Sequence, residues 1–225
     1  MTVYPVTALA PLGERHIPAS AGDLIDPRTT ALLLWDLQLG LGGRANGVDQ
    51  LLPRWIALRD AARAAGTLIV RSRHVAVPHE EMPDTELWRL MRKQDVGSPT
   101  DLAPYMQPGT DDVRFLPGLE PGPDEVVIEK TTPSLFVGTN AQTRLARAGI
   151  RSVVMAGVAT DIGIDFTARH ALALGFFPVV LEDAVGAYTD EAQQRGLASI
   201  RAFAPTSSSA TVIRAWAAAP ERATS

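Results

Sequence analysis

Short runs of consecutive apolar residues recur along the chain, and polar or helix-forming stretches separate them. The runs are rich in β-branched residues and do not alternate with polar residues, which is typical of strands buried on both faces of a parallel sheet. Six such runs predict six strands, at residues 30–36, 67–72, 125–130, 152–158, 177–183 and 209–215.

The stretches between these runs carry the spacing and the end signals of helices. Residues 47–66 repeat apolar positions at helical spacing and end in Gly66, a residue that favours helix C-termini. Further helices are predicted within 84–95, 139–149, 160–175 and 189–204. Because strands and helices alternate, we expect an α/β fold with a doubly wound, mostly parallel six-stranded sheet flanked by helices.

Length and composition narrow the organisation of the chain. Its 225 residues fit one large domain, so we expect a single domain over 1–225. Residues 73–124 interrupt the alternation: they are rich in proline and hold one helix-like piece. A long irregular excursion in an α/β domain is usually functional, so this segment is expected to behave as a lid over a site.

Charge and residue types exclude several classes of protein. The net charge is −4 and basic residues do not cluster, which disfavours nucleic acid or a membrane surface as a partner and favours a small-molecule substrate. The N-terminus lacks the features of a secretory signal, so we expect a cytoplasmic protein. The chain has no cysteine, which excludes disulfides, thiolate metal sites and a cysteine nucleophile.

Candidate chemistry follows from where the predicted strands end. Ligands of open α/β sheets bind outside the carboxyl ends of the strands. Asp36 and Lys130 stand at two of these ends and are candidates for acid–base work, although an aspartate there can also cap a loop and a lysine is usually solvated. Arg71 and Arg73 alternate on one strand, so at most one of them is expected to bind a substrate carboxylate.

Three longer stretches carry a family resemblance. They read LLLWDLQ (32–38), IEKTTPSLFVGTN (128–140) and VVMAGVATDIGIDFTARHALALGFFPVVLEDAVGAYT (153–189). In this order and spacing the chain resembles the isochorismatase-like hydrolases of the cysteine hydrolase superfamily over roughly residues 28–205. The resemblance implies a Rossmann-like three-layer sandwich, a hydrolase without a cofactor or metal, and assembly into a homodimer or homotetramer.

The resemblance also assigns roles to individual residues. Most members of the family are amidases with an Asp–Lys–Cys triad; Asp36 matches the aspartate, Lys130 the lysine, and the nucleophile position falls on Gly163. It further implies a cis peptide between Val158 and Ala159. Six residues are expected to bind substrate: Gln38, Ser134, Phe136, Val158, Ala159 and Thr160.

A site without the thiol leaves three hypotheses open. In the isochorismatase branch, which also lacks the cysteine, Asp36 would protonate a vinyl ether, Lys130 would hold a substrate carboxylate or polarise the departing oxygen, and Gly163 would clear space beside the acid. Alternatively, the chain is an amidase-type member that has lost its nucleophile and only binds a ligand; its GVATDIG stretch looks like that branch. In the third hypothesis a hydroxyl of Thr160 or Ser134 attacks.

Two further departures concern substrate and metal. Gln38 is followed by Leu39, where the family often has asparagine, and His170 replaces an aspartate of the family, so the substrate class stays open. Nicotinamidase-type relatives carry an Asp/His metal site near residues 73–84. Because their tight Asp-x-His pattern is missing, His74 and His79 are expected to lie in a surface loop rather than in a metal site.

Overall fold

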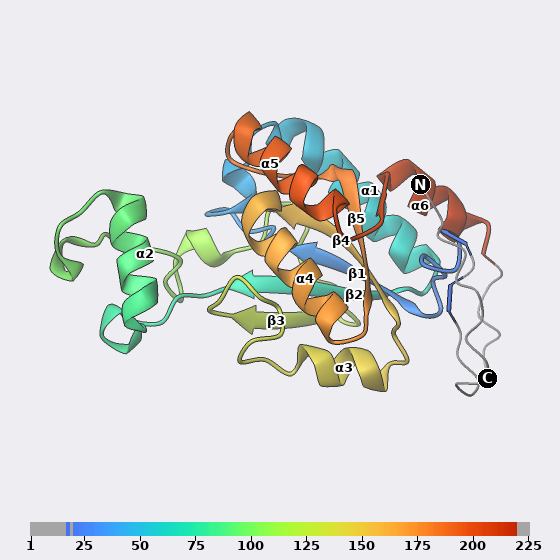
Figure 1. Ribbon diagram of the computed structural model, residues 1–225, viewed down its shortest axis with the longest axis horizontal. Coiled ribbons are helices and arrows are strands. Elements are labelled where there is room, and N and C mark those ends of the chain that lie inside the picture. Colours follow the sequence, from blue (N-terminus) through green and yellow to red (C-terminus); the bar gives the residue numbers. More distant parts are fainter. Residues whose placement is uncertain (1–16, 19, 220–225) are drawn as a thin grey trace.

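The computed structural model describes residues 17–18 and 20–219 (Figure 1). Residues 1–16, on which the expectation about a secretory signal depends, lie outside the described residues. No helix in the described part of the chain is long and apolar enough to cross a membrane.

A six-stranded parallel sheet forms the centre of the fold, as expected. The strand order is β3-β2-β1-β4-β5-β6. The strands are β1 (Thr30–Trp35), β2 (Leu68–His74), β3 (Val126–Lys130), β4 (Ser152–Val158), β5 (Phe177–Gly186) and β6 (Thr206–Ser207). The chain adds strands on one side of β1 and then on the other, so the order reverses between β1 and β4. That switch point is where open α/β sheets bind ligands.

Helices cover both faces of this sheet and complete three layers (Figure 1). Successive side chains of β1 point to opposite faces: Leu32 and Leu34 pack in one apolar cluster, and Leu33 and Trp35 pack in the other. The first cluster includes residues of α1 (Val48–Ala64) and α6 (Ser209–Ala217). The second includes residues of α3 (Ala141–Arg147), α4 (Asp165–Ala173) and α5 (Asp190–Arg201).

The prediction of a strand at 209–215 is wrong, because these residues belong to helix α6. Ser208 caps this helix: its side chain accepts a hydrogen bond from the backbone of Thr211. Val212 and Trp216 are buried four residues apart on the inner face. The β-branched residues of this segment resemble a strand, but the spacing that reaches Trp216 is helical. The sixth strand is a two-residue strand just before the helix.

The proline-rich excursion carries helix α2 (Asp84–Gln94) and several short 3-10 turns. In Figure 1 this helix and its loops project beyond the ends of β1 and β2, away from the body of the sheet. Gln38, just after β1, ties the base of the excursion down: it forms an isolated antiparallel bridge with Phe115. The excursion therefore faces the carboxyl ends of the central strands.

Candidate active site

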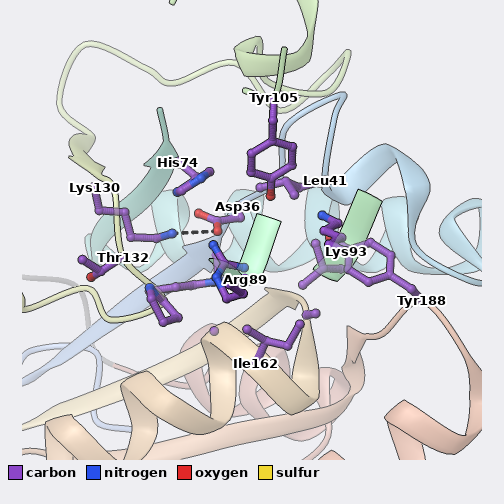
Figure 2. A pocket seen from close by; sticks show the side chains of 15 residues that line it. Asp36, Leu41, His74, Arg89, Lys93, Tyr105, Lys130, Thr132, Ile162 and Tyr188 are labelled. Atoms are coloured by element: carbon purple, nitrogen blue, oxygen red, sulfur yellow. Dashed lines mark hydrogen bonds and ion pairs between the residues drawn. The ribbon is translucent and has the colours of Figure 1, made fainter. Parts of the chain in front are cut away.

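A cavity of about 420 Å³ opens at the switch point of the sheet, between the ends of β1 and β4 and the excursion (Figure 2). Loops after parallel strands converge here, so residues distant in sequence meet. Fifteen residues line it: Trp35, Asp36, Leu41, His74, Arg89, Lys93, Tyr105, Lys130, Thr132, Pro133, Val158, Ala159, Ile162, Gly163 and Tyr188.

Asp36 is held rigidly at the floor of this cavity. It follows β1 directly and adopts a left-handed backbone conformation with φ of 49°, a strained state for an aspartate. Ser72 on the neighbouring strand β2 fixes it twice: the Ser72 Oγ accepts from the Asp36 backbone N–H at 2.9 Å and donates to Oδ1 at 2.5 Å. Ser72 carried no signal in the sequence, because a serine within an apolar run reads as part of a buried strand.

Lys130 completes the arrangement from the end of β3. Its Nζ donates to Asp36 Oδ2 at 2.8 Å (Figure 2). The same Nζ lies 4.3 Å from the centre of the Trp35 ring. Burial lowers the pKa of Lys130, and the nearby Asp36 carboxylate offsets part of that effect. The structure therefore brings the two predicted polar residues together as a buried ion pair in which both partners line the cavity.

His74 also lines the cavity, which corrects its placement in a surface loop. It is the last residue of β2, is only 5% exposed, and its Nε2 has no hydrogen-bond partner among the described residues. Burial, followed by the charge of Lys130, lowers its pKa from 6.5 to about 3, so the ring is neutral near pH 7. The Gln38 amide braces the strand end by bonding the His74 backbone N–H and C=O.

The mouth of the cavity is positively charged. Arg89 and Lys93 reach it from α2, and Figure 2 shows them with Tyr105 and Tyr188 around Asp36. The Lys93 ammonium lies 4.4 Å from the centre of the Tyr105 ring. Burial raises the pKa of Tyr105 to about 12, so its hydroxyl stays protonated near neutral pH. Sequence reasoning did not place these side chains at the site. Arg89, Lys93 and Tyr105 belong to the excursion, which carries no pattern that would point them at the sheet. Tyr188 lies in the loop after β5.

The space expected beside Gly163 is not empty. Gly163 lies in a π-helical turn, Thr160–Ile164, that precedes α4. A Cβ built on it would overlap Nε1 of Trp35 and lie 2.5 Å from Cε2. The expectation that this glycine clears volume beside the acid is therefore corrected: the indole ring occupies that volume. The expected cis peptide between Val158 and Ala159 is present.

The six residues expected to bind substrate divide into two groups. Val158 and Ala159 line the cavity, whereas the other four lie outside its fifteen described lining residues. Thr160 bonds Gln193 on α5 at 2.6 Å. The remaining three are also engaged in packing or hydrogen bonds within the fold: Gln38, Ser134 and Phe136.

Ser134 lies beside a base, His170, but it does not line the cavity. Its Oγ lies 2.8 Å from His170 Nδ1, a contact that the sequence did not reveal. Its side chain is fully buried and also accepts from the backbone N–H of Phe136. A serine enclosed in this way braces the loop after β3, and it is not among the described residues that line the cavity.

The two arginines of β2 do not reach the cavity either. Arg71 is fully buried and pairs with Glu125, and Arg73 pairs with Glu129. At most one of them was expected to bind a substrate carboxylate, and both pair with carboxylates of the protein instead. Arg71 Nη2 and Arg73 Nε have no hydrogen-bond partner among the described residues. Within the described residues no group of three or more His, Asp or Glu side chains is placed to hold a metal ion.

Comparison with known sequences decides the family. A profile of the isochorismatase domain matches residues 30–211. The chain belongs to the isochorismatase family. Members of this family are hydrolases, and the expected family and fold are thereby confirmed.

Two relatives by sequence and one solved structure illustrate what this isochorismatase-family hydrolase is similar to. It is 30% identical to the uncharacterized isochorismatase family protein YecD of Escherichia coli O157:H7, over 74% of this chain and 85% of that protein. It is 27% identical to the ureidoacrylate amidohydrolase RutB of Caulobacter vibrioides (strain NA1000 / CB15N), over 88% and 90%. A solved cysteine hydrolase from Pseudomonas syringae pv. phaseolicola 1448A superposes with a TM-score of 0.75 at 22% identity, over 88% and 96%. That last likeness shows the fold alone.

Proposed function

We propose that this family member hydrolyses a small anionic substrate with water as the attacking group, and that the bond it breaks is a vinyl ether. The observation that carries the proposal is the buried Asp36–Lys130 pair, which lines a cavity in a chain without cysteine. A vinyl ether needs only a proton on carbon and a water molecule, so this reaction requires no nucleophilic side chain.

The pair can supply that proton. Lys130 holds it in the free site and donates to Asp36 Oδ2 at 2.8 Å, and burial has lowered the lysine pKa, so transfer to the carboxylate is within reach. Asp36 then protonates the terminal CH₂ carbon of the vinyl ether and gives an oxocarbenium ion. Water adds to that ion and returns a proton to the pair. The resulting hemiketal collapses to a ketone and an alcohol, so one water is consumed.

The charges around the cavity favour an anionic substrate. Lys130, Arg89 and Lys93 are cationic and face one carboxylate, Asp36. His74 is neutral and adds no charge, because its pKa is about 3. The excess of positive charge matches a substrate with carboxylate groups, such as an enolpyruvyl ether of a ring acid. The cavity of about 420 Å³ falls in the range of small-molecule sites.

One observation favours the second candidate, a family member that binds a ligand without turning it over. The RutB relatives are named amidohydrolases, and here the place of a nucleophile side chain is taken by the Trp35 ring. Such a protein would keep the charged cavity and bind an anion without chemistry. The two candidates differ in turnover.

Pyruvate release from isochorismate in D₂O tests the proposal. If Asp36 protonates the CH₂ carbon, each pyruvate gains one deuterium in its methyl group during turnover, which quenched samples show by mass spectrometry. Asp36→Asn should lose this release, and Ser72→Ala should weaken it because Asp36 loses a donor. Release that persists in Asp36→Asn would remove the proposed acid, and binding without release would favour the second candidate.

Assembly and compartment stay predictions. We expect a homodimer or homotetramer in the cytoplasm, and light scattering of the purified protein would measure the assembly.

A further inference from the structure

Trp35 occupies the place where a side chain at position 163 would project. It is the last residue of β1 and is 1% exposed, yet it contributes to the cavity lining. A Cβ at Gly163 would overlap its Nε1 and lie 2.5 Å and 2.8 Å from Cε2 and Cζ2. Carbon atoms pack at about 3.5–4.0 Å, so no side chain fits at 163 while the indole keeps this position.

Both the backbone and the ring of Trp35 are closely packed. Trp35 pairs in register with Gly157 of β4, and a Cβ at Gly157 would lie 2.7 Å from the Trp35 backbone nitrogen. Gly157 also has a φ of 126°, which side chains rarely allow. Gly157 thus fits against the β1 backbone, which any residue at 35 would present, whereas Gly163 fits against the indole itself. The ring belongs to the buried cluster that includes Leu33 and Ile164.

The same ring also contacts the charged pair. Lys130 Nζ lies 4.3 Å from the ring centre and donates to Asp36 at 2.8 Å. A cation over an indole face is attracted to it, so the ring helps to hold the ammonium against the carboxylate. Trp35 thus touches both halves of the site: the position of a would-be nucleophile and the group that carries the proton.

We infer that Trp35 determines which nucleophile this site can use: its ring takes the volume of a side chain at 163, and attack is left to water. Trp35 and Gly163 then form one packing unit: a side chain at position 163 requires a smaller residue at position 35. The part of the inference that concerns water rests on the proposed function, whereas the packing of the unit does not. Restoring a thiol to this site requires two substitutions, because Gly163→Cys alone meets the indole.

A thermal-unfolding cycle tests the packing. Gly163→Ala should lower Tm by roughly 4–10 °C in the native chain, since overpacking a core is destabilising. In a Trp35→Val background the same change should leave Tm unchanged or raise it. Gly97→Ala is the matched control, because a Cβ there has nothing within 4 Å. Trp35→Phe provides a second background, which keeps a smaller aromatic ring and lacks the indole nitrogen that a Cβ at 163 would overlap.

Thiol chemistry gives a second measurement. The chain has no cysteine, so alkylation of a variant with one introduced cysteine measures that thiol alone. The double variant W35V/G163C should react with iodoacetamide near pH 6.5 at least about tenfold faster than an exposed Gly97→Cys thiol, because Lys130 favours the thiolate. Adding Lys130→Met should remove that advantage. Gly163→Cys alone should unfold at lower temperature than the double variant or resist alkylation.

The results separate this inference from the proposed function. If Gly163→Ala and Gly163→Cys keep the native Tm and the single cysteine reacts as fast as in the double variant, the indole does not block the position and the inference fails. Absence of pyruvate release would refute the vinyl ether reaction but leave the Tm cycle and the alkylation rates unaffected.

Discussion

Two buried ion pairs lie in the same sheet, and they differ in the cation that each uses. Lys130 pairs with Asp36 at the carboxyl ends of the strands and lines the cavity. Arg71 pairs with Glu125, away from that cavity, and its Nη1 donates to the Leu119 carbonyl at 2.9 Å. Arginine keeps its proton under all ordinary conditions, whereas a buried lysine can release it.

The surroundings of the two pairs reinforce this difference. Burial disfavours ionisation of Glu125, but Arg71 and Arg63 outweigh that effect and hold its pKa below the usual value. The second pair is thereby fixed in its charged form. Burial lowers the pKa of both cations, Arg71 and Lys130, against the effect of their partner carboxylates. Only the lysine starts from an ordinary pKa low enough for burial to favour release of its proton. One pair braces the fold, and in the proposed reaction the other moves a proton.

The largest expected effect is on the rate of pyruvate release, which should depend on the Asp36–Lys130 pair and not on the Arg71–Glu125 pair. Asp36→Asn should reduce pyruvate release from isochorismate by roughly 10³-fold, the scale of general acid catalysis. Glu125→Gln should leave kcat within about twofold under conditions where the variant stays folded, because Glu125 contacts no residue of the cavity lining through the bonds it makes. A coupled assay for pyruvate measures both. Equal losses in the two variants would mean that the pairs do not differ in function.

The free energy of unfolding should depend more on the Arg71–Glu125 pair than on the Asp36–Lys130 pair. Glu125→Gln leaves the buried guanidinium of Arg71 without its carboxylate, and we expect a loss of about 3–5 kcal/mol in the free energy of unfolding. Replacing both members of the other pair by Asp36→Leu and Lys130→Met should cost less, because removing a buried pair whole avoids an unpaired charge. Urea denaturation compares them. A larger loss for the double replacement would contradict the distinction between brace and proton carrier.

The sequence predicted the site unevenly, and the reasons are physical. Asp36 and Lys130 could be predicted from the sequence because each follows or ends an apolar strand, and the carboxyl ends of parallel strands lie at one edge of the sheet. Five of the six strands were predicted at their observed places, while the run at 209–215 forms a helix. Gly163 was located but its setting was misjudged, since no local pattern reveals that the Trp35 ring from another strand fills the space beside it.

Sequence reasoning missed residues of the excursion and Ser72 of β2, and it placed His74 in a surface loop rather than at the cavity. Arg89 and Tyr105 face the cavity only because the excursion folds back over the strand ends, which depends on contacts distant in sequence such as the Gln38–Phe115 bridge. Ser72 and His74 lie at the end of β2, where a hydroxyl and a ring belong to the strand pattern. Their roles depend on register with β1 and β3, which no single segment encodes.

A smaller effect should appear in the pKa of His74, which should depend on Lys130 and not on Arg71. The charge of Lys130 contributes to its low pKa after burial, so Lys130→Met should raise that pKa from about 3 toward the usual value. Arg71→Met removes an equally buried cation from its own strand and should not change it. Ring-proton NMR shifts followed against pH measure the difference. An unchanged His74 titration in Lys130→Met would show that the charge of Lys130 does not contribute to the low pKa.

The same histidine makes stability depend on pH. The unfolded chain binds a proton at His74 below about pH 6.5, and the folded chain does so only near pH 3. The unfolded state therefore binds more protons between these values, and this contribution to stability is complete above pH 6.5 and lost as the pH falls. His74→Gln should reduce the slope of stability against pH by up to about 1.4 kcal/mol per pH unit in that window. Urea denaturation at pH 5, 6 and 7 measures the slope, and an unaltered slope would contradict a neutral buried His74.

The smallest effect concerns the cations at the cavity mouth, which differ from Arg63 at the other pair because Glu125 holds Arg63 at 2.5 Å. Arg89 is exposed and its nearest carboxylate, Glu86, lies 3.9 Å away, so it is available to a substrate anion at little cost. Arg89→Ala should raise KM roughly fivefold with little change in kcat, the scale of about 1 kcal/mol that exposed charge pairs contribute. Arg92→Ala is the matched control, since Arg92 lies on the same helix but contacts the Trp88 ring and does not line the cavity. Added salt should shrink the Arg89 effect, because screening weakens exposed charges. A change in kcat without a change in KM would place Arg89 in the chemistry of the Asp36–Lys130 pair rather than in substrate capture.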